Sequence, residues 1–460
     1  KRNDMFKKIL IANRGEIAVR IIRAARELGI QTVAVYSEAD REALHTLLAD
    51  EAVCIGPAKA TDSYLNMHQI ISAAVTLQAE AIHPGFGFLS ENSKFANLCE
   101  EVGVKFIGPS AKVMDTMGDK INARAQMIAA NVPVIPGSDG EVYDATQALE
   151  VAQKIGYPVM LKASAGGGGK GIRKVNSQEE LLPNFSSAQA EAQAAFGNGA
   201  MYMERVIYPA RHIEVQILAD EQGHVVHLGE RDCSLQRNNQ KVLEEAPSIA
   251  IGHTLREKIG AAAVAAAKHV GYENAGTIEF LLDESTGDFY FMEMNTRIQV
   301  EHPVTEFVTN VDIVKNQIKI AAGEALDITQ EDIKITGHAI ECRINAENPK
   351  FNFAPSPGKI TDLYLPSGGV GLRVDSAMYQ GYTIPPFYDS MIAKIIVHGE
   401  KRFEALMKMQ RALFELEVEG VKTNAEFQLD LISDRHVIAG DYDTAFLGET
   451  FLPNYLKKED

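Results

Sequence analysis

Residues 291–302 read Phe291-Met-Glu-Met-Asn-Thr-Arg-Ile-Gln-Val-Glu-His302, and this stretch decides the fold that we expect. Alternate residues of an extended chain share one face, so Glu293, Asn295 and Arg297 are predicted to line up. Two oxygen ligands followed by a guanidinium suit a hard cation that holds a phosphate. The stretch therefore predicts a metal and anion site on one face of a strand.

A predicted strand at residues 276–282 precedes this stretch, and its Glu279 is a third candidate oxygen ligand. Directly opposed residues of an antiparallel hairpin share a face. We expect Glu279 to lie opposite Glu293, with the turn centred on Thr286 and an odd number of residues in the loop. A solvated strand face is the alternative. The apolar neighbours of Glu279 indicate burial instead, where two carboxylates without a cation would be costly.

Residues 165–171 form a glycine run, Ala165-Gly-Gly-Gly-Gly-Lys-Gly171. Glycines allow backbone N–H groups to approach phosphate oxygens, and they allow a loop to open and close. A Walker A loop is excluded, because it would require Gly at position 164 and Ser or Thr at position 171, where the chain has Ser164 and Gly171. A flexible linker is the alternative, although the surrounding cations suit an anion better. These cations are Lys162, Lys170, Arg173 and Lys174.

Two further polar stretches are candidates for ligand contacts. Residues 230–241 supply Arg237 and Lys241 as anion ligands, or they form a surface loop. Residues 83–92, His83-Pro-Gly-Phe-Gly-Phe-Leu-Ser-Glu-Asn92, follow a predicted strand with a Pro-Gly turn. Ligands of open α/β sheets bind at such strand ends, so this loop is expected near the site.

The N-terminal region alternates strand and helix patterns. An apolar run at residues 8–12, helical spacing from 17 to 28 and a second run at 31–36 predict a βαβ unit with parallel strands. The turn at residues 13–16 has a single glycine and lacks the G-x-G-x-x-G pattern of dinucleotide sites. We therefore expect a Rossmann-like shape that does not bind nicotinamide, which argues against a dehydrogenase.

Composition restricts the class of protein. The 460 residues accommodate about three domains, and 46% apolar with 23% charged residues is typical of soluble globular proteins. The net charge of −17 argues against a nucleic-acid partner, and no apolar run approaches the length of a membrane helix. Four widely spaced cysteines predict a reducing cytoplasm rather than disulfides or a zinc site. They are Cys54, Cys99, Cys233 and Cys342.

Met407-Lys408-Met409 matches the core of a biotin-attachment motif. Carrier domains present that lysine at a tight hairpin turn, whereas apolar residues around Lys408 recur at helical spacing. We expect an amphipathic helix and a Lys408 that carries no biotin.

Taken together, these stretches resemble the ATP-grasp ligases and, within them, the biotin carboxylases. The matching motifs occur in order along nearly the whole chain, at residues 12–18, 83–92, 166–169, 230–234, 293–303 and 341–346. The resemblance implies mixed α/β and α+β structure in three domains: a Rossmann-like pre-ATP-grasp domain at 1–117, an ATP-grasp domain at 118–336 with a mobile lid at about 135–207, and a biotin carboxylase C-terminal domain at 337–460.

The implied activity is ATP-dependent carboxylation of biotin N1′ with bicarbonate, through carboxyphosphate. The biotin would be held by a separate carrier protein. Because the chain stops near residue 460, it looks most like the biotin carboxylase component of bacterial acetyl-coenzyme A carboxylase, which supplies malonyl-CoA for fatty acid synthesis. A domain cut from a larger carboxylase is the alternative. Implied partners are the biotin carboxyl carrier protein, carboxyltransferase subunits and a second copy in a homodimer, with neither nucleic acid nor membrane.

Two rival functions remain. Another ATP-grasp ligase would act on a different acceptor, and biotin-dependent ATP turnover distinguishes it. A non-catalytic nucleotide-binding regulator would have lost Glu301, Arg343 or a metal ligand, and the chain retains them.

The resemblance also implies residue roles. The residues that would bind ATP are Lys120, Lys162, Gly168, Gly169, Glu204, Arg205, Val206, Ile207, His212, Gln236, Asn239 and Glu279, with Glu214 nearby. The residues that would bind magnesium or manganese are Glu279, Glu293 and Asn295. Bicarbonate would be bound by Lys241, Arg297, Gln299, Val300 and Glu301, with Glu301 as the base. Biotin would be bound by Arg343, Phe86 and Gly87. The catalytic set is Lys241, Arg297, Glu301 and Arg343.

The chain departs from the family pattern at two positions. Asn239 stands where many members have His, and Phe86 stands where many have Tyr. Both positions lie near biotin in the family, so the departures bear on the affinity for free biotin.

Overall fold

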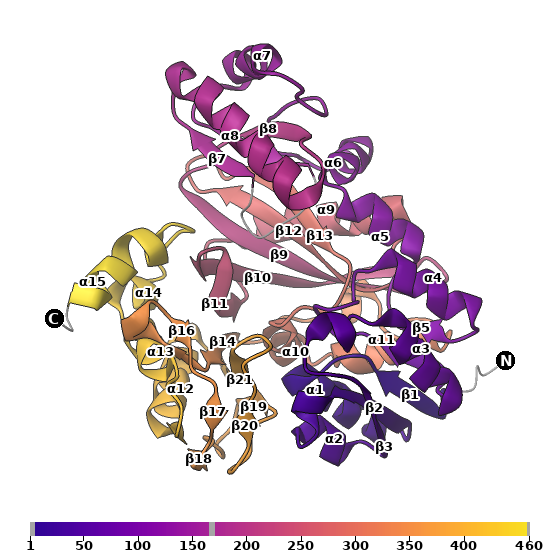
Figure 1. The fold of residues 1–460 in the computed structure, drawn as a ribbon. Helices are drawn as coiled ribbons and strands as arrows, with labels where there is room; N and C mark the ends of the chain where they lie inside the picture. Colours follow the sequence, from indigo (N-terminus) through magenta and orange to yellow (C-terminus); the bar gives the residue numbers. More distant parts are fainter. Residues whose placement is uncertain (1–4, 165–170, 458–460) are drawn as a thin grey trace.

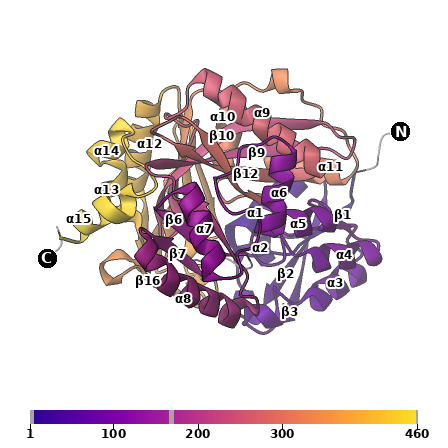
Figure 2. The same ribbon diagram turned by 90° about the horizontal axis from the view of Figure 1, so that it is seen from above.

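The computed structural model describes residues 5–164 and 171–457, so the predicted lid glycines Gly168 and Gly169 lie outside the described residues. The N-terminal part (indigo) and the C-terminal part (orange to yellow) lie side by side, and a smaller lobe (magenta) stands beyond the long central strands (Figure 1). Seen from above, the two terminal parts lie on opposite sides of the molecule (Figure 2). Within the described ranges, none of the helices has the length and apolar character needed to cross a bilayer.

The N-terminal part is a parallel sheet with the strand order β3-β2-β1-β4-β5, which confirms the predicted βαβ unit. Ile9 and Ile11 pack on one face of the sheet and Leu10 on the other, and all three are fully buried, as expected when helices cover both faces. The strands are β1 Lys8–Ile11, β2 Gln31–Ser37, β3 Glu51–Gly56, β4 Ala81–His83 and β5 Lys105–Phe106. The helices are α1 Gly15–Glu27, α2 Leu44–Leu48, α3 Met67–Thr76, α4 Ser93–Glu101 and α5 Ala111–Gly118.

A long sheet continues from the middle of the chain into its C-terminal part. It has eight strands in the order β13-β12-β9-β10-β11-β14-β21-β19, and the pairing of β11 with β14 joins the two parts. The strands are β9 Ala210–Ala219, β10 Val225–Arg237, β11 Gln240–Ala246, β12 Asn274–Asp283, β13 Phe289–Asn295, β14 His338–Asn345, β19 Leu372–Ser376 and β21 Met391–Gly399. Helices α6 Lys120–Ala129, α9 His253–Val270, α10 His302–Thr309 and α11 Ile313–Ala321 accompany it.

The hairpin of β12 and β13 has the predicted register at the site. Glu279 pairs with Glu293, and Thr277 pairs with Asn295. The predicted turn is wrong, because a β-bulge follows Glu279 and shifts the register, so that Phe280 pairs with Phe291. The bulge adds one residue to β13, and the pairing nearest the turn therefore leaves an even number of residues in the loop.

The smaller lobe falls within the region predicted as a lid. Its antiparallel sheet has the order β7-β6-β8, and α7 and α8 pack on it around buried Leu161, Phe185 and Met203. This lobe has its own hydrophobic core. Its elements are β6 Val159–Ala163, β7 Ile172–Val175, β8 Met201–Arg205, α7 Ala145–Ile155 and α8 Gln178–Phe196.

The C-terminal part covers β14 and β21 with helix α12, Arg402–Glu415. Met407-Lys408-Met409 lies within α12, which confirms the predicted helix; buried Leu406 and Met409 face the core. The remaining helices are α13 Ala425–Ile432, α14 Arg435–Ala439 and α15 Leu452–Lys457. The short strands are β15 Glu347–Asn348, β16 Ala354–Pro355, β17 Gly358–Lys359, β18 Asp362–Tyr364, β20 Thr383–Ile384 and β22 Glu417–Glu419.

Candidate active site

Strand β9 alternates two kinds of side chain, and this alternation builds the floor of the candidate site. Ile213, Val215 and Ile217 belong to the core that includes helix α9. His212 and Glu214 therefore point to the opposite face, where both are buried. A polar face buried in a central strand needs partners for its charges, and the neighbouring strands supply them.

Lys241 of β11 lies at the centre of three carboxylates. Its Nζ lies 2.6 Å from Glu214, 3.0 Å from Glu279 and 2.6 Å from Glu301. Burial alone would lower the pKa of Lys241, but the three carboxylates raise it well above the ordinary value. Lys241 therefore remains an ammonium, which can bind an anion but cannot act as a base.

Glu301 is the N-cap residue of helix α10, and each of its two carboxylate oxygens bonds a different cation. Lys241 holds Oε1, and Nη2 of Arg343 donates to Oε2 at 3.0 Å. Burial and the nearby Glu214 would raise the pKa of Glu301, but Lys241, Arg343 and Arg231 lower it below its usual value. The fully buried Glu301 is therefore ionised, which is the form that a general base requires.

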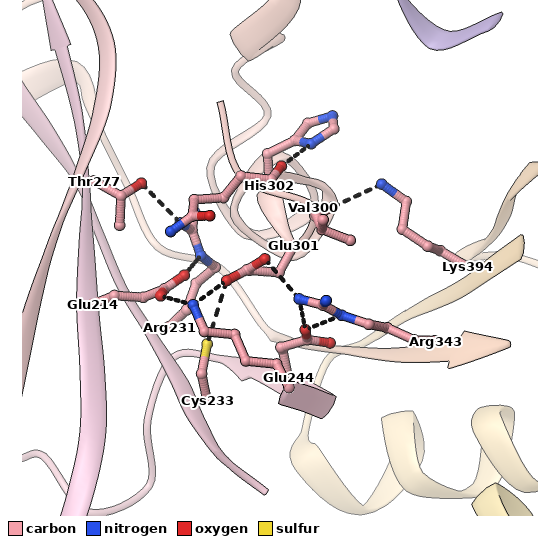
Figure 3. Close-up of polar contacts among 12 residues, drawn as sticks. Glu214, Arg231, Cys233, Glu244, Thr277, Val300, Glu301, His302, Arg343 and Lys394 are labelled. Carbon is pink, nitrogen blue, oxygen red and sulfur yellow. Dashed lines mark hydrogen bonds and ion pairs between the residues drawn. The ribbon is translucent and has the colours of Figure 1, made fainter. Parts of the chain in front are cut away.

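Arg343 of β14 also holds a second carboxylate. Its Nε donates to Glu244 at 2.6 Å (Figure 3). Burial raises the pKa of Glu244 to about 7, although Arg343 opposes the rise. One guanidinium thus lies between a carboxylate with a lowered pKa and one with a raised pKa.

Arg231 of β10 lies behind Glu214 and is fully buried. It donates to Glu214 at 2.6 Å, to Gln216 at 2.8 Å and to the hydroxyl of Thr277 at 3.1 Å. The sequence analysis gave Arg231 no role and placed Glu214 only near the predicted ATP residues. The alternation of polar and apolar residues along β9 could have shown that Glu214 faces the site.

Glu279, Glu293 and Asn295 have the donor set that a divalent cation prefers. Repulsion from Glu279 is the main reason that the pKa of Glu293 rises to about 7. Asn295 Nδ2 donates to Glu279 at 2.8 Å. Two adjacent carboxylates that repel one another fit a hard cation with oxygen ligands.

His212 and Gln236 lie beside this pair. His212 Nε2 is 3.4 Å from Glu279 and 3.6 Å from Glu214, and Gln236 Nε2 is 3.0 Å from His212 Nδ1. Burial would lower the pKa of His212, but Glu279 and Glu214 raise it to about 9. His212, Glu214 and Glu279 also bring one ligand atom each within 4.8 Å of one another, so these three residues could hold a metal ion.

Arg297 is held by its own strand segment and by the loop at residues 83–92. It donates to Asn295 at 3.1 Å and to Gln299 at 2.8 Å. Its Nε also donates to Glu91 at 3.2 Å, and Glu91 accepts from the backbone of Thr296 as well. The loop at residues 83–92 therefore contacts the site, as predicted, but through Glu91, which sequence reasoning did not single out.

Of the predicted nucleotide residues, Lys162 and Glu204 lie in the smaller lobe, and His212, Gln236 and Glu279 lie on strands of the central sheet. Lys162 pairs with Glu204 at 2.6 Å, across β6 and β8. Lys120 begins α6; burial lowers its pKa, and Glu293 partly offsets this effect. The amide groups of Arg205 and Val206 donate to backbone carbonyls of neighbouring segments.

Residues 230–241 are not a surface loop, so that alternative is wrong. They form most of β10 and the start of β11, and Glu230 through Leu235 are buried. Lys241 joins the site, whereas the guanidinium of Arg237 lies 4.0 Å over the ring of Phe353 and bonds Asn352. Asn239 lies in the tight turn between the two strands, exposed and with φ of +61°.

The predicted biotin residues Phe86 and Gly87 lie in the N-terminal part. Asn13 donates to the carbonyl of Phe86 at 2.7 Å and to that of Pro84 at 2.8 Å. Gly87 has φ of +68°, a conformation that favours glycine. These contacts shape the loop, and contact with biotin stays a prediction.

Family models match the chain in three consecutive segments. "Biotin carboxylase, N-terminal domain" matches residues 5–114, "Carbamoyl-phosphate synthase L chain, ATP binding domain" matches 119–329, and "Biotin carboxylase C-terminal domain" matches 341–449. The chain is 58% identical to biotin carboxylase 1 of Bacillus subtilis, covering 97% of this chain and 99% of that protein. It is 55% identical to a pyruvate carboxylase component from Methanothermobacter thermautotrophicus, covering 97% of this chain and 90% of that protein.

A solved structure has the same fold. The biotin carboxylase domain dimer of Hydrogenobacter thermophilus 2-oxoglutarate carboxylase, in complex with MgADP, ADP and bicarbonate, superposes with a TM-score of 0.92. It is 53% identical in sequence, and the match covers 97% of this chain and 98% of that chain.

Proposed function

Because this chain belongs to the biotin carboxylase family, we propose that it catalyses the first half-reaction of acetyl-coenzyme A carboxylase. The chain is an ATP-dependent ligase that carboxylates biotin. It uses ATP, magnesium and biotin held on a carrier protein. The acetyl-coenzyme A role is the further step of the proposal, since relatives of similar identity serve pyruvate and 2-oxoglutarate carboxylases.

One observation carries the site assignment: Glu301 is buried between Lys241 and Arg343, with one oxygen on each. Bicarbonate must lose a proton before it attacks the γ-phosphate of ATP. Glu301 is ionised and accepts that proton, while Lys241 and Arg297 stabilise the dianion that results. Arg297 donates to Asn295 and Gln299, and both of these residues also bond Glu279 beside Lys241. Gln299 and the backbone of Val300 complete the bicarbonate site.

Biotin meets Arg343 after carboxyphosphate has formed. Deprotonated biotin carries an enolate-like negative charge on its ureido group, which a guanidinium stabilises. Arg343 is already oriented by Glu244, so little reorganisation is needed when the anion forms. Phe86 and Gly87 would contact the biotin ring from the N-terminal part.

The nucleotide would lie between the smaller lobe and the central sheet. Lys120 and Lys162 hold its phosphates, together with the backbone of Gly168 and Gly169. Glu279, Glu293 and Asn295 would hold a divalent cation, which would neutralise negative charge on those phosphates. The adenine contacts fall to Glu204, Arg205, Val206, Ile207, His212, Gln236 and Asn239. Two of these backbone amides, those of Arg205 and Val206, already donate to the carbonyls of Pro136 and Pro158.

The assembly belongs to the same proposal. We infer a homodimer and separate carrier and carboxyltransferase proteins, supported by the dimer of the Hydrogenobacter relative. The four cysteines of the chain are unpaired, which is consistent with a reducing cytoplasm. We also propose that the domain boundaries lie at 117/118 and 336/337, with a lid at about 135–207.

The decisive assay measures phosphate release from ATP, with bicarbonate and biotin each omitted in turn. A biotin carboxylase requires both for full turnover, and magnesium omission abolishes it. ATP cleavage that ignores biotin would indicate another ATP-grasp ligase, and the absence of any cleavage would indicate a regulator.

The acceptor is tested by reconstitution. The chain is combined with carrier and carboxyltransferase proteins of an acetyl-CoA carboxylase or of a pyruvate carboxylase, with labelled bicarbonate. We expect label in malonyl-CoA. Label confined to oxaloacetate would overturn the acetyl-CoA assignment and leave the biotin carboxylase activity intact.

A further inference from the structure

Lys394 of β21 is a fully buried lysine that has no role in the site described so far. Its Nζ donates to the carbonyl of Val300 at 2.7 Å (Figure 3) and forms an ion pair with Glu16 at 3.1 Å. An ammonium removed from water costs several kcal/mol unless its charge and donors are matched. The groups that Lys394 holds therefore indicate what it does.

The first of these groups, the carbonyl of Val300, lies next to the proposed base Glu301 in the chain. Val300 immediately precedes Glu301, and the carbonyl of Val300 belongs to the planar peptide unit that ends at the Glu301 Cα. Glu301 is also the N-cap residue of α10. A bond that fixes this carbonyl fixes the direction in which the Glu301 side chain leaves the backbone.

Lys394 also has a defined relation to Arg343. The two residues are directly paired across β14 and β21, so their side chains share a face. Arg343 donates to the carboxylate of Glu301 at 3.0 Å, and Lys394 donates to the backbone one residue earlier. Two paired residues of β14 and β21 therefore bond the carboxylate of Glu301 and the backbone carbonyl that precedes it.

The second group comes from the N-terminal part. Glu16 lies in the first turn of α1, after the turn that lacks the dinucleotide pattern, and its side chain is buried. Burial would lower the pKa of Lys394, but Glu16, Glu341 and Asp375 together raise it. Burial also raises the pKa of Glu16, and Lys394 opposes that rise. The same turn supplies Asn13, which holds the loop of Phe86. A turn that binds a dinucleotide in other folds here contacts two parts of the active site.

We propose that Lys394, anchored by Glu16, is a positioning residue that aligns Glu301 with bicarbonate. The proposal deepens the proposed function and rests on Glu301 being the base. It predicts an effect on bicarbonate kinetics that leaves nucleotide binding unchanged, because no described contact joins Lys394 to the predicted ATP residues.

The test compares Lys394→Met with Lys408→Met. Lys408 also donates to a carbonyl of β21, that of His398 at 2.8 Å, but it lies on α12 and belongs to none of the assigned sites. We expect Lys394→Met to lower kcat/KM for bicarbonate by about 10- to 100-fold, the scale of a misplaced reacting group, with the KM for ATP unchanged. Lys408→Met should leave both parameters at the parent values.

A double-mutant cycle separates positioning from a general loss of structure. If Lys394 acts through Glu301, its substitution should cost little more once Glu301→Gln is present. An equal loss in both backgrounds would overturn the proposal, and so would a folded Lys394→Met with bicarbonate kinetics within about twofold of the parent.

Two milder variants cover a Lys394→Met that fails to fold. Lys394→Arg keeps the charge and should recover much of the bicarbonate activity, while Glu16→Gln should raise the KM for bicarbonate several-fold. If both milder variants match the parent for bicarbonate, the positioning role is wrong. A parent chain without bicarbonate-dependent ATP cleavage would instead refute the proposed function itself.

Discussion

Glu301 and Arg343 touch one another, yet they act in different chemical steps. Glu301 removes the proton from bicarbonate, so Glu301→Gln keeps the shape of the side chain and removes its basicity. We expect bicarbonate-dependent ATP cleavage to fall by about 10²-fold or more, the scale of general-base catalysis. Phosphate release measured with and without bicarbonate checks this expectation. Full activity would require a different base.

Arg343→Ser is the matched substitution for the later step. It should bind ATP and retain much of the slow biotin-independent ATP cleavage, because Arg343 stabilises an anion that forms afterwards. Biotin carboxylation should fall by about 10²- to 10³-fold, the loss typical of one anion-stabilising donor. If both variants lose both activities equally, the assignment of Glu301 and Arg343 to separate steps is wrong.

Glu214 has a stability role that its charge environment predicts. It is fully buried between Lys241 and Arg231, and both cations hold its pKa well below the ordinary value despite burial. Glu214→Gln leaves these buried cations short of one carboxylate and should lower the free energy of unfolding by about 3 kcal/mol. Urea denaturation measures the loss, with the exposed Glu101→Gln as the control. Equal urea midpoints for the parent and Glu214→Gln would contradict this stabilising role of Glu214.

Residue-level prediction from sequence succeeded where a motif carries the chemistry. Lys241, Glu301 and Arg343 come from three separate motifs, and the structure brings their side chains within hydrogen-bonding distance. Lys394 was missed because it is a lone charge in an apolar strand, and its partner Val300 is 94 residues away. Arg231 was missed because it lies between Glu230 and Asp232, and the sequence does not show that it binds Glu214 instead.

At the scale of single elements, helix α12 contains the Met407-Lys408-Met409 sequence. Lys408 is half-buried, donates to the carbonyl of His398 and pairs with Glu404 at 3.0 Å. We expect the purified chain to carry no biotin, because a lysine within a helix does not match the hairpin turn of a carrier domain. A streptavidin blot of the chain should be negative. A positive blot that Lys408→Arg abolishes would contradict this expectation.

The hairpin of β12 and β13 shows where element-level prediction stops. Alternation of polar and apolar residues fixed which face Glu279 and Glu293 share, and their pairing is confirmed. The bulge beyond them could not be foreseen, since an extra residue in one strand leaves the pattern near the site unchanged. The same limit applies to residues 230–241, whose polar character suggested a loop although neighbouring strands bury Glu230 through Leu235.

At the scale of the whole molecule, Glu245 ties the middle of the chain to its C-terminal part. It lies on β11 and binds His338 of β14, Arg402 of α12 and Tyr442. Burial would raise the pKa of Glu245, but His338 and Arg402 lower it far below the ordinary value of 4.5. A carboxylate with a depressed pKa in the folded state contributes stability above its unfolded pKa and loses it as the pH falls.

Thermal unfolding should therefore become easier as the pH falls below about 4.5, the range in which an unfolded Glu begins to take up a proton. Glu245→Gln should unfold at a lower temperature at neutral pH and show a shallower decline in acid. Differential scanning fluorimetry between pH 7 and about pH 3 checks both outcomes, because the loss falls below the unfolded pKa of Glu. Parallel pH profiles for the parent and Glu245→Gln would show that other groups control acid stability.

The pairing of β11 with β14 has a practical consequence for cutting the chain. A fragment that ends near residue 336 would keep β11 but lose β14, leaving the backbone groups of residues 243–246 without their partners. Such an exposed edge is a template for other strands, so the fragment is expected to self-associate. A chimera that exchanges the C-terminal part would face the same problem unless the donor supplies a matching strand. Recombination between relatives should therefore favour junctions before β9 over junctions between β11 and β14.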